Sequence, residues 1–263
     1  MAKKFHIIGL NSFGISLFKY LKKKKLKVSI SDLKNKKDLK KFFKSEAYKY
    51  CKFANHPEDL ISSADIVIYT PGVVKNDQLY IRAVKNKKIV SEIDIFKMYS
   101  KWPREKILSI TGSKGKSTCC NYIKKKLEKK RIFKKIFIAG RKDLPLTSLP
   151  KYKRGYFLIA ELDYQLLSIK KLYDSKYNII TNIDNKENYL FSLRNYMNIK
   201  FNLINLKKVS FLITTKKIKL KTNFPKRKIL IKTISNIKDS NVTSKNLSDR
   251  FINLISKPFI NFL

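Results

Sequence analysis

Short apolar runs alternate with longer, lysine-rich amphipathic stretches along most of the chain, and this alternation limits the possible folds more than any other feature. Continuous apolar runs bounded by turn residues are typical of strands buried on both faces, and the stretches between them have helical length. The pattern predicts an α/β fold in which helices cover both faces of parallel sheets. The expected strands are FHIIGL, KVSISD, DIVIYTPG and KIVSEI, then KILSITG, IFIAG, YFLIAEL, NIITNI and VSFLITT.

A polar stretch that contains Pro103 separates the two series of strands. Because such stretches mark boundaries, we expect one domain over residues 1–101 and a second over residues 102–215. Beyond residue 215 the alternation weakens, although KILIKTI (228–234) has strand character and LSDRFINLISKPF has the apolar spacing of a helix. Two elements are too few for another independent domain, so residues 216–263 are predicted to form a short remnant tail.

The chain carries 60 lysines and arginines against 19 acidic residues, which gives a net charge of +41. Such a balance is common in proteins that bind nucleic acid or anionic membranes. Here the lysines are spread along the whole chain among Ile, Asn, Phe and Tyr, which is the mixture that AT-rich codons supply. Without an RNA-binding aromatic signature, zinc spacing or heptad repeat, we expect no specific nucleic-acid partner; a functional basic surface is the alternative.

The sequence also bounds the cellular setting. No run of 18 apolar residues occurs, so no membrane insertion is expected. The three cysteines have no disulfide-framework spacing, which fits a reducing compartment. We therefore expect a cytoplasmic protein, and a monomer.

The first glycine motif follows the opening strand and reads Gly9-Leu-Asn-Ser-Phe-Gly14, with Asn11 at the middle position of the G-x-G-x-x-G frame. Gly9 would allow a tight turn, and Gly14 would allow close packing of a helix whose N-terminus faces an anion. Asp32 ends the second strand, where an acid commonly accepts hydrogen bonds from ribose-type hydroxyls. These features indicate a Rossmann-like, nucleotide-binding domain; a turn without a ligand is the alternative.

Two further residues extend this first site. Pro71 and Gly72 form a turn at the carboxyl end of another predicted strand. Ligands of open α/β sheets sit at this edge. We therefore expect the turn to line the same nucleotide site.

The second motif, T-G-S-K-G-K-S-T, lies between a predicted strand and a predicted helix. Backbone N–H groups of such a loop cradle phosphates, the final lysine reaches the β- and γ-phosphates, and the following hydroxyl ligates Mg²⁺. The motif lacks the first glycine of the usual pattern, but its strand–loop–helix context favours a P-loop-type domain. The residues expected to bind ATP are Gly112, Ser113, Lys114, Gly115, Lys116, Ser117 and Thr118.

This loop resembles the shortened phosphate loop of the Mur ligases, the ATP-dependent enzymes that add amino acids to the peptidoglycan precursor. IIGLNSFGISLFKYL, the acid Asp32, the turn Thr70-Pro-Gly-Val73 and VSEIDIF resemble segments of their first domain. The sister branch that adds L-alanine usually has a His-Gly-Lys-Thr loop, so Lys-Gly-Lys-Ser favours the branch that adds D-glutamate.

Similar segments continue downstream in the same order. The stretch from Ala139-Gly140 to Pro145 resembles the family's Gly-Asn-Ile-Gly-x-Pro, and Ala160-Glu161-Leu-Asp-Tyr-Gln165 resembles Glu-Leu-Ser-Ser-Phe-Gln. Asn182-Ile-Asp184 with the later Tyr196 to Lys200 spacing resembles the family's Asn…Asp-His…Tyr-x-x-x-Lys. The resemblance spans roughly residues 5 to 206 over six segments, and this collinearity is more specific than any single motif.

The resemblance implies a reaction with ATP and Mg²⁺ as cofactors. ATP would phosphorylate the alanyl carboxylate of UDP-N-acetylmuramoyl-L-alanine, and the amine of D-glutamate would then displace phosphate from the acyl phosphate. The implied catalytic residues are Lys116, Glu161 and Lys200; the implied metal ligands are Ser117, Glu161 and a carbamylated Lys200; and the implied UDP-substrate residues are Gly9, Ser12, Gly14, Asp32, Pro71 and Gly72. From the residues alone, the alternative for Glu161 is a capping or solvent-facing acid at a strand end, and the alternative for Lys200 is one more lysine on a solvated helix.

Two departures from the family pattern bear on activity. Asn185 stands where the family has a metal-ligating His, and the 57 residues from Lys207 to Leu263 are too few for the family's third domain. We therefore expect a truncated or eroded ligase that turns over poorly by itself. A non-catalytic nucleotide- or UDP-sugar-binding remnant is the main alternative. A Rossmann-type oxidoreductase is disfavoured by the second phosphate loop and the absent middle glycine.

Overall fold

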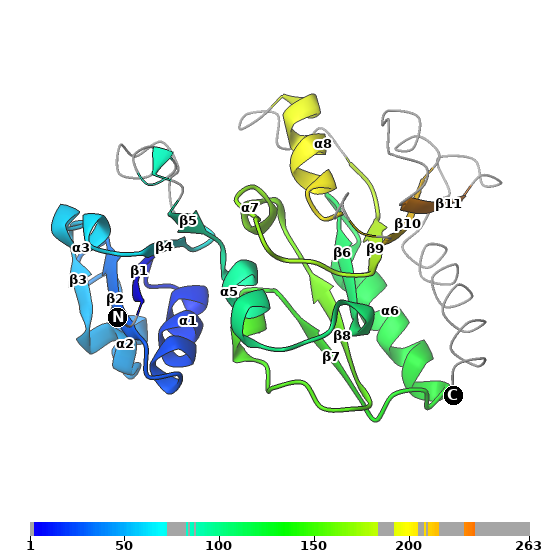
Figure 1. Cartoon of the computed structure of the whole chain (residues 1–263), viewed down its shortest axis with the longest axis horizontal. Helices are drawn as coiled ribbons and strands as arrows, with labels where there is room; N and C mark the ends of the chain where they lie inside the picture. The colour runs from blue at the N-terminus through cyan, green and yellow to red at the C-terminus, as the bar shows by residue number, and fades with distance from the viewer. Residues whose placement is uncertain are drawn as a thin grey trace. The chain divides into compact units, whose positions relative to one another are not determined.

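The computed structural model describes residues 3–72, 83, 85–86, 88–183, 192–204, 208, 210–215 and 229–234. The chain divides into two compact units, each built on a parallel sheet (Figure 1). The first unit contains Met1–Ser100, Lys142–Pro150 and Ile169–Tyr173, and the second contains the remaining segments. Two short segments of the first unit thus come from the stretch that the sequence analysis places in the second domain, and the division at residue 101 stays a prediction.

The sheet of the first unit has the strand order β3-β2-β1-β4-β5, and all of its pairs are parallel. The order reverses between β1 and β4, where doubly wound sheets bind ligands at the carboxyl ends of their strands. Its elements are β1 (Lys4–Ile8), α1 (Ser12–Lys23), β2 (Lys27–Asp32), η1 (Lys40–Phe42), α2 (Glu46–Lys49), β3 (Cys51–Phe53), α3 (Glu58–Ser62), β4 (Ile66–Tyr69), β5 (Ile89–Val90), α5 (Glu92–Tyr99) and η3 (Leu146–Ser148).

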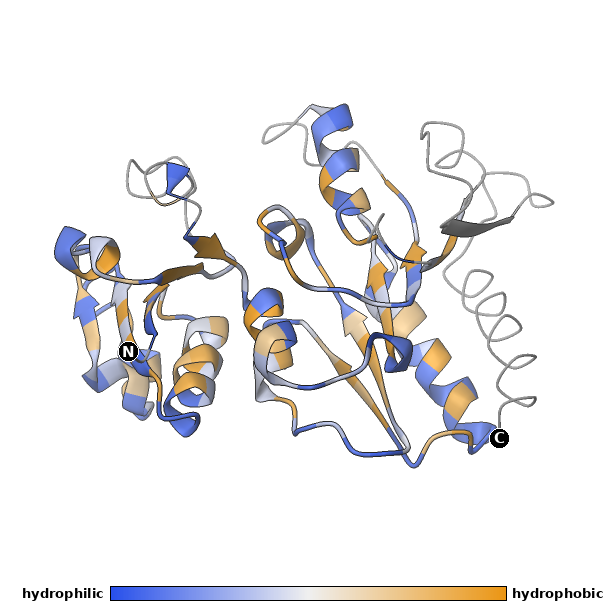
Figure 2. Cartoon of the chain, in the orientation of Figure 1, coloured by the Kyte–Doolittle hydropathy of each residue, from blue (hydrophilic) through white to orange (hydrophobic). Residues whose placement is uncertain are grey.

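The sheet of the second unit has the order β11-β10-β9-β6-β8-β7 and is also parallel throughout. Figure 2 shows mostly hydrophobic strands and, in α6, alternating hydrophobic and hydrophilic positions. Its elements are η2 (Arg104–Lys106), β6 (Ile107–Thr111), α6 (Lys116–Lys129), β7 (Lys135–Ala139), β8 (Tyr156–Glu161), α7 (Tyr164–Leu167), β9 (Tyr177–Ile180), α8 (Leu193–Phe201), β10 (Ser210–Thr215) and β11 (Ile229–Ile234).

Apolar burial explains these elements. In the second unit, Cys119, Cys120, Ile123 and Leu127 form one face of α6 and lie in a core with strand residues such as Ile110. The spacing of these four positions places them on one side of a helix, while the intervening lysines face water. The first unit buries Leu17, Phe18 and Leu21 of α1 against β1 and β2 in the same way.

Two buried acids of α5 hold distant segments within the first unit. Glu92 accepts a hydrogen bond from the Thr147 N–H at 2.6 Å. Asp94 accepts hydrogen bonds from the N–H groups of Lys171, Leu172 and Tyr173. Burial raises the pKa of Glu92 to about 7, because desolvation disfavours its charged form. These contacts explain why residues 142–150 and 169–173 belong to the first unit.

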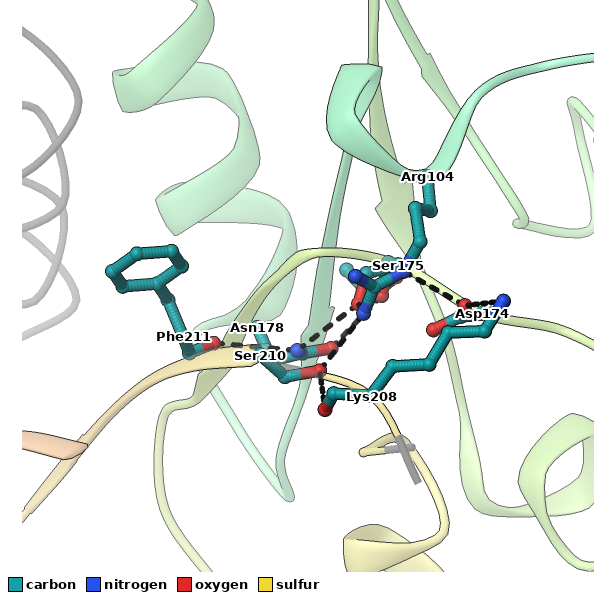
Figure 3. A network of polar contacts seen from close by, with 8 residues as sticks. Arg104, Asp174, Ser175, Asn178, Lys208, Ser210 and Phe211 are labelled. Carbon is teal, nitrogen blue, oxygen red and sulfur yellow. Dashed lines mark hydrogen bonds and ion pairs between the residues drawn. The ribbon is translucent and has the colours of Figure 1, made fainter. Parts of the chain in front are cut away.

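A polar network joins the amino ends of three strands in the second unit (Figure 3). Arg104, before β6, pairs with Asp174 at 2.8 Å and donates to Ser210, the first residue of β10, at 3.0 Å. Ser175, before β9, donates to Asn178 at 2.9 Å. The network lies at the edge of the sheet where strands begin, so it ties the scaffold together away from the strand ends that carry the phosphate loop.

The structure confirms the α/β class with two parallel sheets, and each of the nine expected strands overlaps an observed one. KILIKTI forms β11, whereas the three-residue β3 was too short for its apolar pattern to be noticed. LSDRFINLISKPF lies outside the described residues. In the part of the chain that is described, no helix has the length and apolarity to cross a membrane.

Candidate active site

The phosphate loop follows β6, and its backbone depends on two glycines. Gly112 has φ 148° and Gly115 has φ 76°, both in the region that favours glycine. A Cβ on Gly112 would lie 2.0 Å from Thr181 Oγ1 and 3.0 Å from the Asn182 carbonyl oxygen. The loop therefore approaches the end of β9 so closely that a side chain at Gly112 has no room.

Asn182 and Thr181 fix the first part of this loop. The Asn182 side-chain oxygen accepts hydrogen bonds from the N–H groups of Ser113 at 3.1 Å and Lys114 at 2.8 Å. The Thr181 hydroxyl donates to the Lys114 carbonyl at 2.8 Å. In the sequence, Asn182 stands out only as part of a family resemblance, and its role in holding the loop could not be predicted from that. The pairing of β6 with β9 was the structural information needed to find it.

The N-terminus of α6 is presented at the same edge. Gly115 is the N-cap and has no side chain with which to cap the helix. The first N–H groups of a helix have no partner within it, and they attract anions. Lys116 Nζ lies over the loop and donates to the carbonyls of Gly112 at 2.8 Å and Ser113 at 3.4 Å. Ser117 and Thr118 follow in the first turn and are exposed.

Glu161 lies beside the loop because β8 pairs with β6, with Glu161 opposite Ile110. It is 7% exposed and accepts a hydrogen bond from Ser117 Oγ at 2.7 Å. Arg141 Nη1 lies 3.9 Å from its other oxygen. Sequence reasoning missed Arg141, because only the next strand end brings it to the carboxylate.

The oxygen donors of this site fit a magnesium ion that is held mainly by the phosphates of a bound nucleotide and only in part by the protein. Within the described residues no group of three or more His, Cys, Asp or Glu side chains could hold a metal. Ser117 and Glu161 nevertheless place a hydroxyl and a carboxylate oxygen together, and these hard ligands suit Mg²⁺, which keeps several waters and bridges phosphates.

α8 completes the site with a buried lysine and a tyrosine one turn apart. Lys200 is 1% exposed, and its Nζ donates to the Gly112 carbonyl at 3.4 Å. The same Nζ lies 5.0 Å from the ring centroid of Tyr196 and 5.8 Å from that of Tyr164. The Tyr196 hydroxyl lies 3.3 Å from Ser113 Oγ. Lys200 is thus part of the phosphate-loop surroundings, and the interpretation of a solvated lysine is wrong.

In the first glycine turn, in the first unit, side chains of the turn itself accept the hydrogen bonds of the helix N-terminus. Gly9 has φ 104°, and a Cβ on Gly14 would lie 2.0 Å from the Gly9 carbonyl oxygen. Asn11 is the N-cap of α1, and its Oδ1 accepts from the N–H groups of Phe13 at 3.0 Å and Gly14 at 3.1 Å. These are donors that an anion at the helix N-terminus would otherwise use.

The neighbouring residues of this turn are also joined to one another. The Asn11 amide nitrogen donates to Thr70 Oγ1 at 2.9 Å and to the Pro71 carbonyl at 2.8 Å. Asp32 accepts from the N–H groups of Leu10 at 2.7 Å and Lys34 at 2.9 Å. Asp32 therefore holds the turn in shape.

The remaining predicted residues are placed as follows. Ser12 is the first residue of α1, and Gly72 has φ 92° with open space around its Cβ position. The structure thus brings the predicted residues of the first unit to one edge of its sheet. Val73, Asp184 and Asn185 lie outside the described residues.

The structure describes an α/β protein with two parallel sheets and a glycine turn in each unit, the second of them a phosphate-type loop. Comparison of the sequence with known families agrees with this class. Residues 3–91 match the family described as "Mur ligase MurD-like, N-terminal domain". The chain belongs to the Mur ligase family.

Its relatives carry a more particular name. The "UDP-N-acetylmuramoylalanine--D-glutamate ligase" of Buchnera aphidicola subsp. Schizaphis graminum is 31% identical over 183 residues, 69% of this chain and 40% of the relative. The protein of that name from Borreliella burgdorferi (strain ZS7) is 30% identical over 183 residues, 67% of this chain and 38% of the relative. The chain thus spans about two fifths of the length of these curated relatives.

A solved structure supports the fold. The UDP-N-acetylmuramate:L-alanyl-gamma-D-glutamyl-meso-diaminopimelate ligase from Neisseria meningitides matches with a TM-score of 0.53 and 14% identity, over 88% of this chain and 78% of that one. At this identity the likeness concerns the fold alone.

Proposed function

We propose that this chain carries the substrate- and ATP-binding parts of an ATP-dependent ligase that adds D-glutamate to UDP-N-acetylmuramoyl-L-alanine in peptidoglycan precursor synthesis. The observation that carries the proposal is the meeting of the uncapped N-terminus of α6, Lys116 and the Ser117–Glu161 pair at one sheet edge. The names of the relatives supply the two substrates. The reaction would proceed through an acyl phosphate.

The residues of the second unit would act mainly by holding phosphates in place. Phosphoryl transfer depends on positioning and charge neutralisation more than on covalent chemistry by the protein. The N–H groups at the start of α6 would receive the phosphates, and Lys116 would exchange its carbonyl partners at Gly112 and Ser113 for phosphate oxygens. When bound, Mg²⁺ supplies positive charge between the phosphates. Ser117 and Glu161 would hold it.

The first unit would bind the UDP-sugar at the carboxyl ends of β1 and β4. Gly9, Ser12, Gly14, Asp32, Pro71 and Gly72 are the residues proposed for this site. Because Asn11 occupies the N–H groups of Phe13 and Gly14, the ligand would contact Ser12 and the open side of Gly72 instead. We place the protein in the cytoplasm as a monomer.

A second function remains, namely nucleotide and UDP-sugar binding without turnover. It would need only the contacts of Lys116 and of the Ser117–Glu161 pair, which can hold phosphates whether or not a product forms. Both functions predict that the chain binds ATP and the UDP-sugar, and only the first predicts that it forms the D-glutamyl product.

Phosphate release separates these functions. The purified chain is incubated with ATP, Mg²⁺, UDP-N-acetylmuramoyl-L-alanine and D-glutamate, beside Lys116→Ala and the matched variant Lys114→Ala. A ligase releases phosphate only when both substrates are present. Lys116→Ala abolishes the release, whereas Lys114→Ala retains it, because it removes only an exposed side chain and keeps the backbone N–H through which Lys114 is expected to contribute to the loop. Binding of ATP without substrate-dependent release would favour the second function.

A further inference from the structure

One surface of the first unit gathers exposed lysines around two exposed aromatic rings. Residues 39–50, which lead into β3, form a run of turns that includes η1 and α2, and α2 lies next to α1 (Figure 1). Leu39 and Ala47 anchor this run in the core of the unit, while Phe43 and Tyr50 are 58% and 51% exposed. The exposed lysines of the run and of the last turn of α1 are Lys22, Lys23, Lys40, Lys41, Lys44 and Lys49. These six lysines, with Phe43 and Tyr50, are called the lysine–aromatic face below.

Direct contacts join the two parts of this face. The ring centroids of Phe18 on α1 and Tyr50 lie 5.4 Å apart, and Lys22 Nζ lies 4.6 Å from the Tyr50 centroid. Within the run, Lys44 Nζ lies 5.9 Å from the ring centroid of Phe43. The face is therefore a single surface built from two elements, and ammonium groups lie over its aromatic rings.

Both ends of this face lie away from the glycine turn of the same unit. Lys22 and Lys23 end α1 before β2 begins, and Lys49 and Tyr50 come directly before β3. Because β1, β2 and β3 are parallel, these positions lie at the amino ends of the strands, whereas the Gly9 turn follows the carboxyl end of β1. A partner bound there would leave the proposed UDP-sugar edge of the sheet open.

The composition of the face fits an anionic lipid surface. Glu46 is the only acid among residues 39–50, and α1 contains none, so the lysines meet little opposing charge. Clusters of roughly four to eight lysines are attracted to the anionic headgroups of a bilayer. Exposed aromatic rings among such lysines add apolar burial at the boundary between headgroups and acyl chains.

Two observations favour lipid over nucleic acid. A base stacks on the face of an aromatic ring, and an ammonium already lies over a face of both Phe43 and Tyr50, whereas the edge of a ring can still enter between headgroups. In addition, residues 3–72 contain no arginine, the side chain whose planar fork recognises phosphates in a fixed geometry. Lysine point charges suit a fluid layer of headgroups, which sets no such geometry.

We propose that the lysine–aromatic face docks this protein reversibly on membranes that contain anionic lipid, with Phe43 and Tyr50 at the level of the headgroups. The docking goes beyond the ligase function and needs neither ATP nor the UDP-sugar. The lysines supply an attraction that weakens as salt rises, and the rings supply one that persists.

Vesicle co-sedimentation of the full chain tests the proposal. Vesicles of phosphatidylcholine with phosphatidylglycerol should bind the protein, and vesicles of phosphatidylcholine alone should not. Replacing Lys40, Lys41 and Lys44 together with Gln should weaken binding about a hundredfold, since each lysine near an anionic surface contributes roughly fivefold. Phe43→Ala should weaken it about tenfold through lost apolar burial.

α6 supplies a matched control for the loss of charge. Lys125, Lys126 and Lys129 are exposed on this helix of the second unit, and the structure shows no exposed large hydrophobic residue among the described positions of α6. Replacing these three with Gln changes the net charge by the same amount and should keep most of the affinity. Equal losses in the two triple variants would show that binding follows net charge, and the proposal would be overturned.

A second measurement needs no variant to fold. Hydrogen–deuterium exchange of the parent chain should slow in peptides covering residues 39–50 when anionic vesicles are added, and should not change in peptides covering residues 124–131. Exchange at residues 39–50 that ignores anionic vesicles would overturn the proposal. Protection of these residues by single-stranded RNA but not by vesicles would overturn it as well and assign the face to nucleic acid. Loss of ATP binding would leave the proposal standing, because the docking is independent of the ligase site.

Discussion

The two glycine turns of this protein share a strand–turn–helix plan and differ in what occupies the start of the helix. In the first turn, Asn11 caps α1 with its own side chain and is joined to Thr70 and Pro71. In the second, the cap of α6 is Gly115, which has no side chain, and Lys116 lies over the loop instead. The first turn satisfies its own donors, whereas the second presents donors and a cation to a ligand. A glycine frame alone therefore does not define a phosphate site.

The largest effect on stability is expected when a side chain is placed where Gly14 and Gly9 approach each other in the first turn. In Gly14→Ala the new Cβ would meet the Gly9 carbonyl oxygen at 2.0 Å, and backbone cannot move aside easily. We expect the free energy of unfolding to fall by about 3 kcal/mol or more, at or above the upper end of the usual cost of overpacking. Denaturant titration measures it.

Gly72→Ala is the matched control for Gly14→Ala. It has open space at its Cβ position and a left-handed backbone at φ 92°, so it should cost only about 1–2 kcal/mol. Equal losses in the two variants would show that the close approach does not matter.

A buried histidine on the strand that leads into the first turn should make the stability of the protein sensitive to acid. His6 on β1 is buried, and desolvation, with the nearby His56 second, lowers its pKa to about 4 from 6.5. Its folded pKa lies below its unfolded value, so its contribution is complete above pH 6.5 and is lost as pH falls toward 4, by up to roughly 3 kcal/mol. His6→Gln should remove this dependence in urea unfolding between pH 4 and 7.

Glu92, in the same unit, should give the opposite dependence of stability on pH. Its pKa is raised from 4.5 to about 7, so the stability it contributes is present below pH 4.5 and is lost as pH rises to 7. Glu92→Gln keeps an acceptor for the Thr147 N–H and should stabilise the protein at pH 8 relative to pH 4.5. An unchanged pH dependence in both His6→Gln and Glu92→Gln would rule out this account of the two groups.

Removing the cation of the second turn should weaken binding without weakening the fold. Lys116→Ala is expected to cost about 1.5–3 kcal/mol of ATP binding free energy, the range for hydrogen bonds to charged groups. Calorimetry in Mg²⁺ measures the loss. Lys114→Ala should lose little, because it removes an exposed side chain of the same loop and keeps the backbone N–H. ATP affinity equal to that of the parent in Lys116→Ala would remove the second turn from consideration as the triphosphate site.

The smallest change in stability should come from making the first turn resemble the second. Asn11→Gly replaces a capping side chain with a residue that is also accepted at this position, at a cost of a few tenths of a kcal/mol for the cap itself. It uncovers the N–H groups of Phe13 and Gly14. In a Lys116→Ala background, Asn11→Gly should gain pyrophosphate binding measurable by calorimetry. No gain would mean that Asn11 is not what closes the first turn.

Much of the fold could be predicted from the sequence because it follows from local patterns. The apolar runs marked nine strands, and the glycine frames marked both turns. The closure of the first turn by Asn11 could not be foreseen, since an Asn at that position either faces a ligand or caps its own helix. The choice is decided by contacts with Thr70 and Pro71, about sixty residues away.

Long-range contacts also hid parts of the candidate site. Lys200 is one of many lysines in the sequence, and only the packing of α8 against the loop buries it. Arg141 reaches Glu161 because their strands, β7 and β8, are neighbours in the sheet. The same holds for Glu92 and Asp94, whose burial depends on segments that follow them by more than fifty residues.

The most direct test of the difference between the turns is hydrogen–deuterium exchange with and without ATP and Mg²⁺. The account predicts slower exchange in peptides covering residues 112–120, where the α6 donors meet the phosphates, and no change in peptides covering residues 9–16. Protection of residues 9–16 with none at residues 112–120 would contradict it.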